Sequence, residues 1–184
     1  FIDGWFRTGD AGKLVDGKHL YMTDRIKDLF KTSNGKYIAP QQIETILGGD
    51  VFIEQVAVIG NNRNYVTAII APNIEAIKGY AEQNGIKYEY VDELMDNPQV
   101  CKMMEERIAE LQKDMAPYEK IKKFRLIKRG FTIESGELTS TLKLRRAVIL
   151  QNYAAMIEEM YNPVKGPLGG YVKYIDTLPC KEMI

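Results

Sequence analysis

Short apolar runs on either side of turn residues predict two β-hairpins near the start of the chain. The first hairpin spans residues 10–23 and turns at Asp16-Gly17, a dipeptide typical of tight hairpin turns. The second pairs residues 29–31 with residues 36–38, and Gly35 supplies a positive φ in the turn between them. The start of the chain is therefore predicted to be β-structure.

Further along the chain, apolar residues recur at helical spacing and alternate with short β-rich runs. The predicted helices are residues 40–47, 74–83, 98–115 and 144–160, with a short helix or turn at 90–95. The predicted strands are residues 55–60, 65–71 and 124–127, and the second has the continuous apolar character of a strand buried on both faces. These elements predict the α+β fold class: a small mixed domain of short β-hairpins and a small sheet packed with three to four helices.

The charge balance argues against a nucleic-acid partner. The chain has 184 residues, with 25 Lys plus Arg and 25 Asp plus Glu, so its net charge is zero. A nucleic-acid-binding surface normally leaves a basic excess that is missing here. The basic stretch at residues 120–129 is best interpreted as an edge strand guarded by lysines, with attraction of phosphates as the alternative.

The apolar runs also bear on location. None approaches the ~20 residues that a membrane helix needs, so no integral membrane segment is expected, while peripheral membrane contact stays open. Residues 1–10 lack the basic start and apolar core of a signal peptide, and we expect a cytoplasmic protein. Because the chain lacks an initiator Met and opens inside dense motif sequence, we expect it to be a piece of a longer protein.

Two clusters near the start of the chain contain charged residues that could carry chemistry. Residues 4–10 end in Thr-Gly-Asp, and the carboxylate of Asp10 at a strand entry could bind vicinal hydroxyls of a ribose. A plain turn is the alternative, and spacing alone favours it. Residues 24–28, Asp-Arg-Ile-Lys-Asp, alternate in charge, which on composition alone indicates a solvated, ion-paired surface.

A third cluster, residues 139–146, places three hydroxyl residues before Lys143. A lysine on a flexible polar loop can reach into a site and meet a phosphate as a point charge. The alternative is the start of a helix, with Thr141 as the N-cap and with Lys143, Arg145 and Arg146 as exposed charges. Chemistry alone favours the helix start.

Together, the order and spacing of these clusters resemble the adenylate-forming superfamily, and most closely its long-chain fatty acid:CoA ligases. Trp-Phe-Arg-Thr-Gly-Asp at 5–10 is similar to the family's Trp-x-x-Thr-Gly-Asp, and residues 24–28 are similar to its hinge. Residues 34–44 resemble the segment after the hinge, and Leu-Thr-Ser-Thr-Leu-Lys-Leu-Arg-Arg at 138–146 resembles the long-chain version of the catalytic-lysine motif. The resemblance covers about residues 3–161 and is to the C-terminal lid of an AMP-forming acyl-CoA synthetase.

The resemblance implies a division of the chain and a two-step reaction. Residues 1–24 would end a large N-terminal domain, residues 25–161 would form the lid, and residues 162–184 would be an irregular tail. In this family a fatty acid carboxylate attacks the α-phosphate of ATP, which Mg²⁺ accompanies, and gives acyl-AMP and pyrophosphate. The lid then swings, and the thiol of coenzyme A (CoA) attacks the acyl-AMP to give a thioester.

By match to the family's motifs, three residues would serve the first step. Lys143 would be the catalytic lysine that meets the carboxylate and the α-phosphate. Asp10 would bind the ribose hydroxyls of ATP or AMP, and Arg25 would lie beside the same ribose and phosphate. Lys27 would be the hinge residue, which must absorb a large backbone change.

The second step would use the hairpin after the hinge. Gly35 would line the CoA channel, where a side chain would block the pantetheine arm, and Lys31 would lie on the same face and assist thioester formation. Glu44 is expected to be a structural residue of its helix. No residue of the chain is assigned as a metal ligand.

The chain departs from the family at Asp24, Ser140 and Leu142, where many relatives have Gly, Pro and Gly. It also contains no Gly-rich phosphate loop, so we expect no adenylation activity from this chain alone. Two other functions stay open. One is an adenylation domain that loads a carrier protein, and the other is a non-catalytic interaction module with the same fold.

Overall fold

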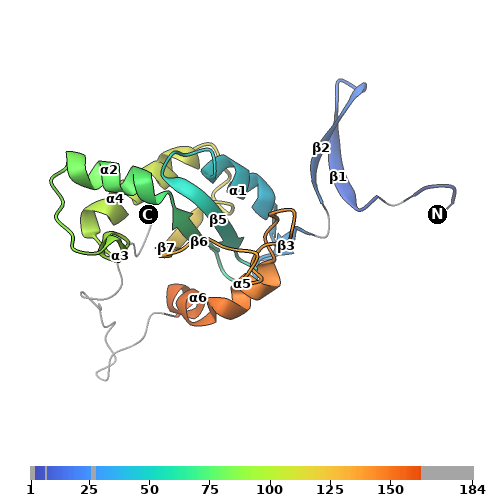
Figure 1. Ribbon diagram of the computed structural model, residues 1–184. Coiled ribbons are helices and arrows are strands. Elements are labelled where there is room, and N and C mark those ends of the chain that lie inside the picture. The colour runs from blue at the N-terminus through green and yellow to red at the C-terminus, as the bar shows by residue number, and fades with distance from the viewer. Residues whose placement is uncertain (1–2, 7, 26–27, 163–184) are drawn as a thin grey trace, which may run out of the picture.

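A computed structural model describes residues 3–6, 8–25 and 28–162 of the chain. Its elements in chain order are β1 (Asp10–Val15), β2 (His19–Arg25), β3 (Phe30–Lys31), β4 (Tyr37–Ile38), α1 (Pro40–Leu47), β5 (Ile53–Ile59), β6 (Val66–Pro72), α2 (Ile74–Gln83), α3 (Val91–Leu94), α4 (Pro98–Leu111), β7 (Ile121–Leu126), α5 (Arg146–Asn152) and α6 (Ala154–Tyr161). The predicted α+β class is confirmed (Figure 1). The described part has six helices rather than three to four, because residues 91–94 form a short helix and the last predicted helix is divided.

The last predicted helix, residues 144–160, differs most from expectation. It consists of α5 and α6, which meet at Tyr153, where φ is −108° and ψ is 20°. The helical part begins only at Arg146, because Leu144 forms an isolated antiparallel bridge with Leu138. The helical spacing of apolar residues predicts one continuous helix from residue 144. It gives no sign that the first two residues of that range pair with an earlier segment of the chain instead.

The centre of the fold is a three-stranded sheet in the order β5-β6-β7. β5 runs antiparallel to β6, and β7 runs parallel to β6 on the other side. All residues of β6 are buried, as the sequence predicted for a strand covered on both faces. Alternate residues of β5 and β6 therefore belong to two different cores, one on each face of the sheet.

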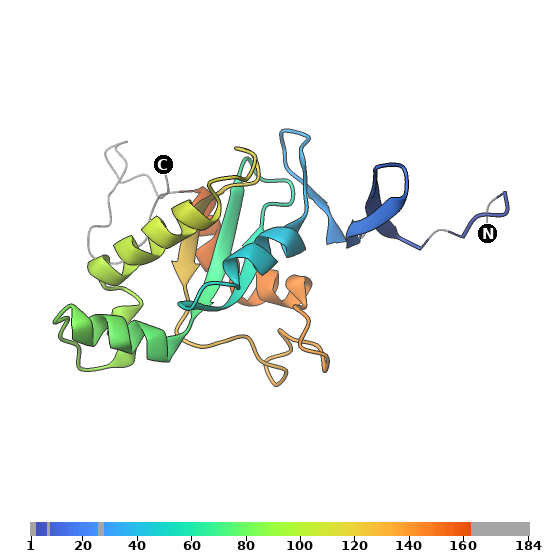
Figure 2. The same ribbon diagram turned by 90° about the horizontal axis from the view of Figure 1, so that it is seen from above.

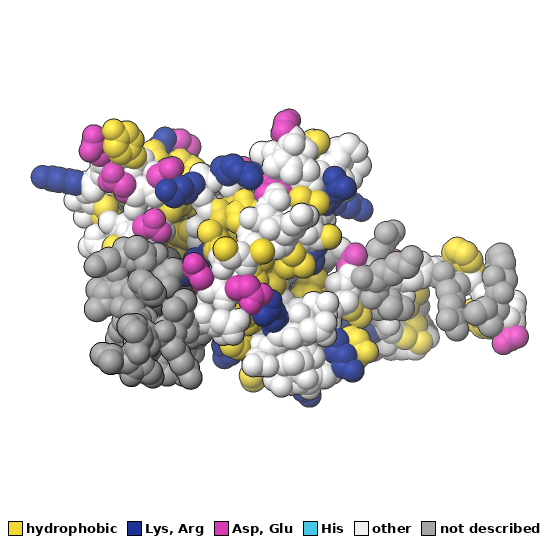
Figure 3. All heavy atoms as spheres, turned by 90° about the horizontal axis from the view of Figure 1, so that it is seen from below, with side chains coloured by type: hydrophobic (Ala, Val, Ile, Leu, Met, Phe, Trp, Pro, Cys, Tyr) yellow, Lys and Arg dark blue, Asp and Glu magenta, His cyan; other side chains and the backbone are white. Residues whose placement is uncertain are grey.

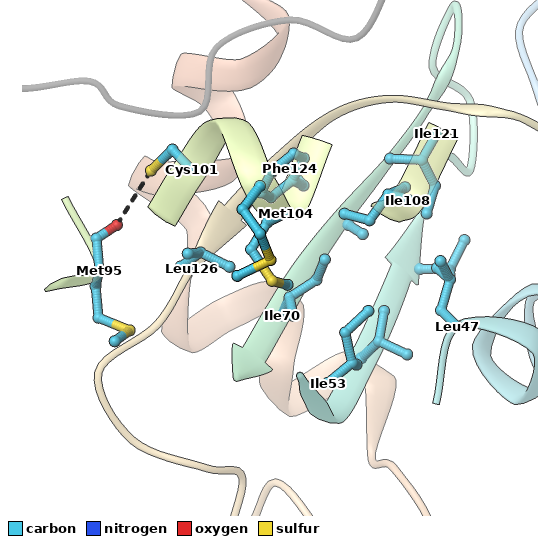
Figure 4. Packing of buried hydrophobic residues seen from close by; sticks show 14 of the residues in the cluster. Leu47, Ile53, Ile70, Met95, Cys101, Met104, Ile108, Ile121, Phe124 and Leu126 are labelled. Carbon is cyan, nitrogen blue, oxygen red and sulfur yellow. Dashed lines mark hydrogen bonds between the residues drawn. The ribbon is translucent and has the colours of Figure 1, made fainter. Parts of the chain in front are cut away.

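The larger core joins the sheet to α1, α2 and α4. Figure 4 shows Ile70 of β6 together with side chains from two of these helices: Leu47 of α1, and both Met104 and Ile108 of α4. Each is fully buried, and burial of one such side chain contributes about 1.5–3 kcal/mol. This face of the sheet therefore fixes α1, and with it the β3–β4 hairpin that leads into α1.

The smaller core lies on the opposite face, under α5 and α6. Ile69 of β6 packs there with Ile149 of α5 and Ile157 of α6. Phe131 and Leu138, from the connection between β7 and α5, are buried in the same cluster. The long connection that carries Lys143 is therefore attached to the core at two points.

The β1–β2 hairpin stands apart from the sheet (Figure 1). Its apolar side chains lie open to solvent, and Figure 3 shows exposed hydrophobic side chains on the side of the molecule where this hairpin lies. They include Leu14, Leu20, Tyr21 and Met22, each more than half exposed. The hairpin thus presents an apolar surface with nothing packed on it in the described structure.

Across residues 3–6, 8–25 and 28–162, no helix combines the length and the apolar character needed to cross a membrane.

Candidate functional site

The site residues predicted from the sequence lie at three places in the fold. Asp10 and Arg25 are at the base of the β1–β2 hairpin, and Lys31 and Gly35 are on the β3–β4 hairpin. Lys143 precedes α5. Figure 2 shows the loop before α5 and the β3–β4 turn on opposite sides of α1. The predicted hinge residue, Lys27, lies outside the described residues.

The register of the first hairpin pairs Asp10 directly with Arg25. A bulge between Ala11 and Gly12 shifts the pairing, and this shift sets the two residues opposite each other. The main-chain N–H of Asp10 donates to Thr8 Oγ1 over 3.1 Å. An acidic and a basic residue from different motifs thus become cross-strand neighbours.

The β3–β4 hairpin turns through Gly35, whose φ of +81° is in the left-handed region. The turn is closed by a bond from Gly35 N–H to Thr32 O at 2.9 Å. A Cβ added at Gly35 would have only Lys31 Cε within 4 Å, at 3.8 Å. Any other residue would be strained there and would project into space that the described residues leave open.

Lys31 is exposed beside this open space. Its Nζ lies 5.5 Å from the centroid of the Tyr37 ring, across the hairpin. A cation held over an aromatic face has fewer orientations than a free surface lysine. The hairpin therefore offers an unobstructed backbone next to a positive charge.

Lys143 is exposed at the end of a small closed loop. Leu142 N–H donates to Thr139 O over 2.9 Å, and Thr139 N–H donates to Lys143 O over 2.8 Å. Thr139 Oγ1 also accepts from Lys143 N–H at 3.0 Å. The interpretation of this motif as a helix start with Thr141 as the N-cap is wrong, because α5 begins at Arg146 with Arg145 at the N-cap.

A buried carboxylate supports this loop. Glu137 has no solvent exposure and precedes the Leu138–Leu144 bridge. Its carboxylate accepts from Arg129 Nη1 at 2.8 Å and Nη2 at 3.0 Å. It also accepts from Ser135 Oγ at 2.6 Å and from Asn152 Nδ2 of α5 at 3.0 Å.

These donors outweigh the cost of burial for the Glu137 charge. Desolvation by itself would raise its pKa, but the bonds from Arg129, Ser135 and Asn152 lower the pKa from 4.5 to about 2. Sequence reasoning missed Glu137. The only local signal was an acidic residue next to Leu138, the first apolar residue of the lysine motif.

A second carboxylate joins three elements. Glu44 of α1 accepts from Val58 N–H of β5 at 2.8 Å. Arg146 of α5 binds both oxygens of Glu44, at 2.7 and 3.1 Å, and also donates to Val58 O at 2.7 Å. Glu44 is therefore structural, as its place in the motif suggested. Because Arg146 opens α5, this ion pair fixes the far end of the segment that carries Lys143.

A cavity of about 620 Å³ lies between β7, α3 and the α5–α6 pair, away from the predicted site residues. Arg125 lines it, with its Nη2 3.5 Å from Glu159 of α6. Burial lowers the pKa of Arg125, and the Glu159 charge opposes that shift. No group of three or more His, Cys, Asp or Glu side chains suited to a metal ion occurs among the residues that the structure describes.

Comparison with known proteins gives a consistent result. A family model described as "AMP-binding enzyme C-terminal domain" matches residues 27–165. A long-chain-fatty-acid–CoA ligase of Mycobacterium tuberculosis is 32% identical over 163 residues, which cover 88% of this chain and 27% of the relative.

Among the solved structures that the fold resembles are two adenylation domains. The adenylation domain of a carboxylate reductase from Mycobacterium chelonae has a TM-score of 0.71 and 26% identity, over 88% of this chain and 24% of that one. The corresponding domain from Segniliparus rugosus, in complex with AMP and a co-purified carboxylic acid, has a TM-score of 0.70 and 25% identity over the same shares. The chain thus spans about a quarter of the length of each of these proteins.

The buried Glu137 carboxylate predicts a pH-dependent stability difference. The folded pKa of about 2 lies below the ordinary 4.5, so the stabilisation is complete above about pH 5 and is lost as pH falls towards 2. The gap corresponds to about 3 kcal/mol. Glu137→Gln should therefore lower the free energy of unfolding at pH 7 by about 3 kcal/mol, and this deficit should shrink between pH 5 and pH 2. Chemical denaturation of the two proteins across this range measures it.

The matched control is Glu134→Gln, an exposed acid in the same segment, which should change stability little at any pH. A Glu137→Gln deficit that stays constant down to pH 2 would show that the carboxylate does not carry the stabilising charge.

The backbone conformation of Leu142 predicts that Gly is more stable than Ala at this position. Its φ of +59° is in the left-handed region, where an L-residue is strained and Gly is not. Leu142→Gly should therefore be more stable than Leu142→Ala by about 1 kcal/mol, the reverse of the order at ordinary positions. Thermal unfolding of the pair measures the sign, and a more stable Ala variant would refute the loop conformation.

Proposed function

The chain belongs to the family of AMP-binding enzyme C-terminal domains, and from that premise we propose that it is the lid of an ATP-dependent long-chain fatty acid:CoA ligase. In the first step, a fatty acid carboxylate oxygen attacks the α-phosphorus of ATP. The bond from that phosphorus to the pyrophosphate leaving group breaks, which gives acyl-AMP and pyrophosphate. In the second step, the thiol of CoA attacks the acyl carbon, loses its proton, and displaces AMP.

The observation that carries the proposal is Lys143 at the end of an ordered, exposed loop. The loop is closed on Thr139 and supported by the buried Glu137. A lysine held in this way could reach the reacting centre when the lid closes over ATP. Its cation would offset the negative charge that grows on the phosphoryl oxygens in the transition state.

The nucleotide would be bound at the base of the first hairpin. Asp10 would accept hydrogen bonds from the ribose hydroxyls, and Arg25, its cross-strand partner, would lie beside the ribose and phosphate. Mg²⁺ would arrive with ATP. Lys27 would be the hinge about which the lid, residues 25–161, turns relative to residues 1–24.

The second step would use the β3–β4 hairpin. The open space next to Gly35 fits the close passage of a pantetheine arm, because a Cβ would occupy that space. Lys31 is adjacent, and its charge would assist the attack of the thiol. The opposite locations of this hairpin and the Lys143 loop (Figure 2) support a lid that turns a different side to the acyl-adenylate in each step.

The exposed apolar hairpin supports docking against an upstream domain. Leu14, Leu20 and Met22 each lie more than half exposed, and apolar surface of this kind usually marks an interface. On this proposal the chain works as part of a larger cytoplasmic protein that binds ATP, the fatty acid and CoA. The chain alone would form no acyl-AMP. Peripheral contact with a membrane would be a property of the whole protein.

Two alternatives lead to different assays. An adenylation domain that loads a carrier protein would form acyl-AMP but no thioester with free CoA. A non-catalytic interaction module would release no pyrophosphate at all. Thioester formation with free CoA separates the first alternative from the ligase, and pyrophosphate release separates the second.

We predict that Lys143→Ala in the full-length protein lowers fatty-acid-dependent pyrophosphate release by ~10² or more, the loss expected for a charge-stabilising group. The assay supplies ATP, Mg²⁺ and a panel of fatty acids, with and without CoA. The control is Lys102→Ala, an exposed lysine of α4 whose ion pair with Glu106 is 3.9 Å long, and it should release pyrophosphate normally. Release that is robust and indifferent to Lys143 would refute the catalytic role of the loop.

A further inference from the structure

The turn between β5 and β6, residues 60–64, lies against the tip of the β3–β4 hairpin. Asn62 N–H donates to Lys31 O over 2.8 Å, and Ser33 N–H donates to Arg63 O over 2.9 Å. Both are main-chain bonds, so they fix backbone against backbone. The two segments are far apart in the sequence and belong to different sheets.

The side chain and carbonyl of Asn64 add two further bonds to the same tip. Asn64 Oδ1 accepts from Ser33 Oγ at 2.7 Å, and Asn64 O accepts from Asn34 Nδ2 at 3.2 Å. Together with the main-chain bonds, these contacts hold the residues immediately before Gly35. The position of Gly35 therefore depends on the position of the turn.

Arg63 attaches this turn to α6. Its guanidinium forms a bidentate ion pair with Glu158, in which Nη1 donates to Oε2 at 3.2 Å and Nη2 donates to Oε1. The same group lies over the Tyr161 ring, 4.7 Å from its centroid. The hydrogen bonds raise the pKa of Arg63 and lower the pKa of Glu158, so the pair stays charged at neutral pH.

Tyrosines continue this attachment beneath the turn. Tyr65 packs on Tyr161 with ring centroids 5.0 Å apart and donates to Met160 O at 2.8 Å. The Tyr161 hydroxyl lies 2.9 Å from Thr67 Oγ1, and burial raises the pKa of Tyr161 to about 12. The end of α6 is thus fixed to the start of β6, the strand that follows the turn.

We propose that Arg63 and Asn64 are positioning residues for the thioester step, a proposal that rests on the proposed function. They hold the hairpin tip so that Gly35 meets the pantetheine arm of CoA in one geometry. An exposed ion pair by itself contributes little. This one is bidentate, lies on an aromatic ring and continues into main-chain bonds with the tip, so its loss would move the residues that contact CoA.

The test is half-reaction kinetics on the full-length protein with ATP, Mg²⁺, a long-chain fatty acid and CoA. Arg63→Gln should slow thioester formation roughly 10- to 100-fold, as expected for a small misplacement near the reacting atoms, and leave the acyl-AMP burst unchanged. Asn64→Ala should have the same selective effect. Arg63→Lys, which keeps the charge but loses the bidentate geometry, should fall between wild type and Arg63→Gln.

Two further variants separate positioning from general stability. The double variant Arg63→Gln/Glu158→Gln should form thioester no more slowly than Arg63→Gln alone, because the two substitutions remove the same ion pair. The matched control is Arg107→Gln. Arg107 forms the same kind of pair with Asp50 and lies 4.7 Å from the Phe52 centroid, but these partners are not on the hairpin. It should not affect the thioester step selectively.

The proposal is overturned if Arg63→Gln slows acyl-AMP formation and thioester formation equally, if neither step changes, or if Arg107→Gln reproduces the selective defect. These outcomes leave the proposed ligase function intact, since wild type still completes both steps. A wild-type protein that forms acyl-AMP but transfers nothing to CoA would overturn both proposals at once.

Discussion

The buried carboxylate of Glu137 is the interaction on which the lysine-bearing loop depends. An unpaired buried charge would be costly by several kcal/mol, so the carboxylate must keep all its donors. Two of those donors, Arg129 and Ser135, lie in the connection after β7, and the third, Asn152, is the last residue of α5. Because Glu137 is held in place, the next residue, Leu138, is held as well. Leu138 begins the loop that ends in Lys143.

The candidate sites are separated because both faces of the sheet are covered by helices. Since every residue of β6 is buried, helices must cover both faces, and the chain has to cross from one face to the other to supply them. The β3–β4 hairpin is attached through α1 on one face, and the Lys143 loop is attached through α5 on the other. Arg146 with Glu44, and Arg63 with Glu158, connect the two sides. On the proposed function, such a body would turn as one unit, and the hinge would absorb the change.

The sequence predicted those features that depend on neighbouring residues. Pro40 starts α1 as expected. The helix α2 spans residues 74–83, the range that the sequence predicted. The positive φ of Gly35 is also as predicted. These signals are local, because a turn or a cap is decided within a few residues.

What the sequence did not reveal depends on partners far along the chain. The break at Tyr153 and the bridge at Leu144 override a continuous helical pattern. Arg63 reads as an ordinary loop residue, yet its partner Glu158 is 95 residues away. The family resemblance identified Lys143. No sequence pattern predicted that the acid supporting its loop is buried, because a charge can be buried only where the fold brings its hydrogen-bond donors together.

The most direct test of the account gives the full-length Lys143→Ala protein a chemically prepared fatty acyl-adenylate together with CoA. This substrate bypasses the first step, so only the side of the lid that carries Gly35 is required. We predict thioester formation within about threefold of the wild-type rate, although the same protein should react much more slowly when it starts from ATP and fatty acid. An equal loss from both starting points would contradict it, because Lys143 would then support the domain as a whole rather than the adenylation step.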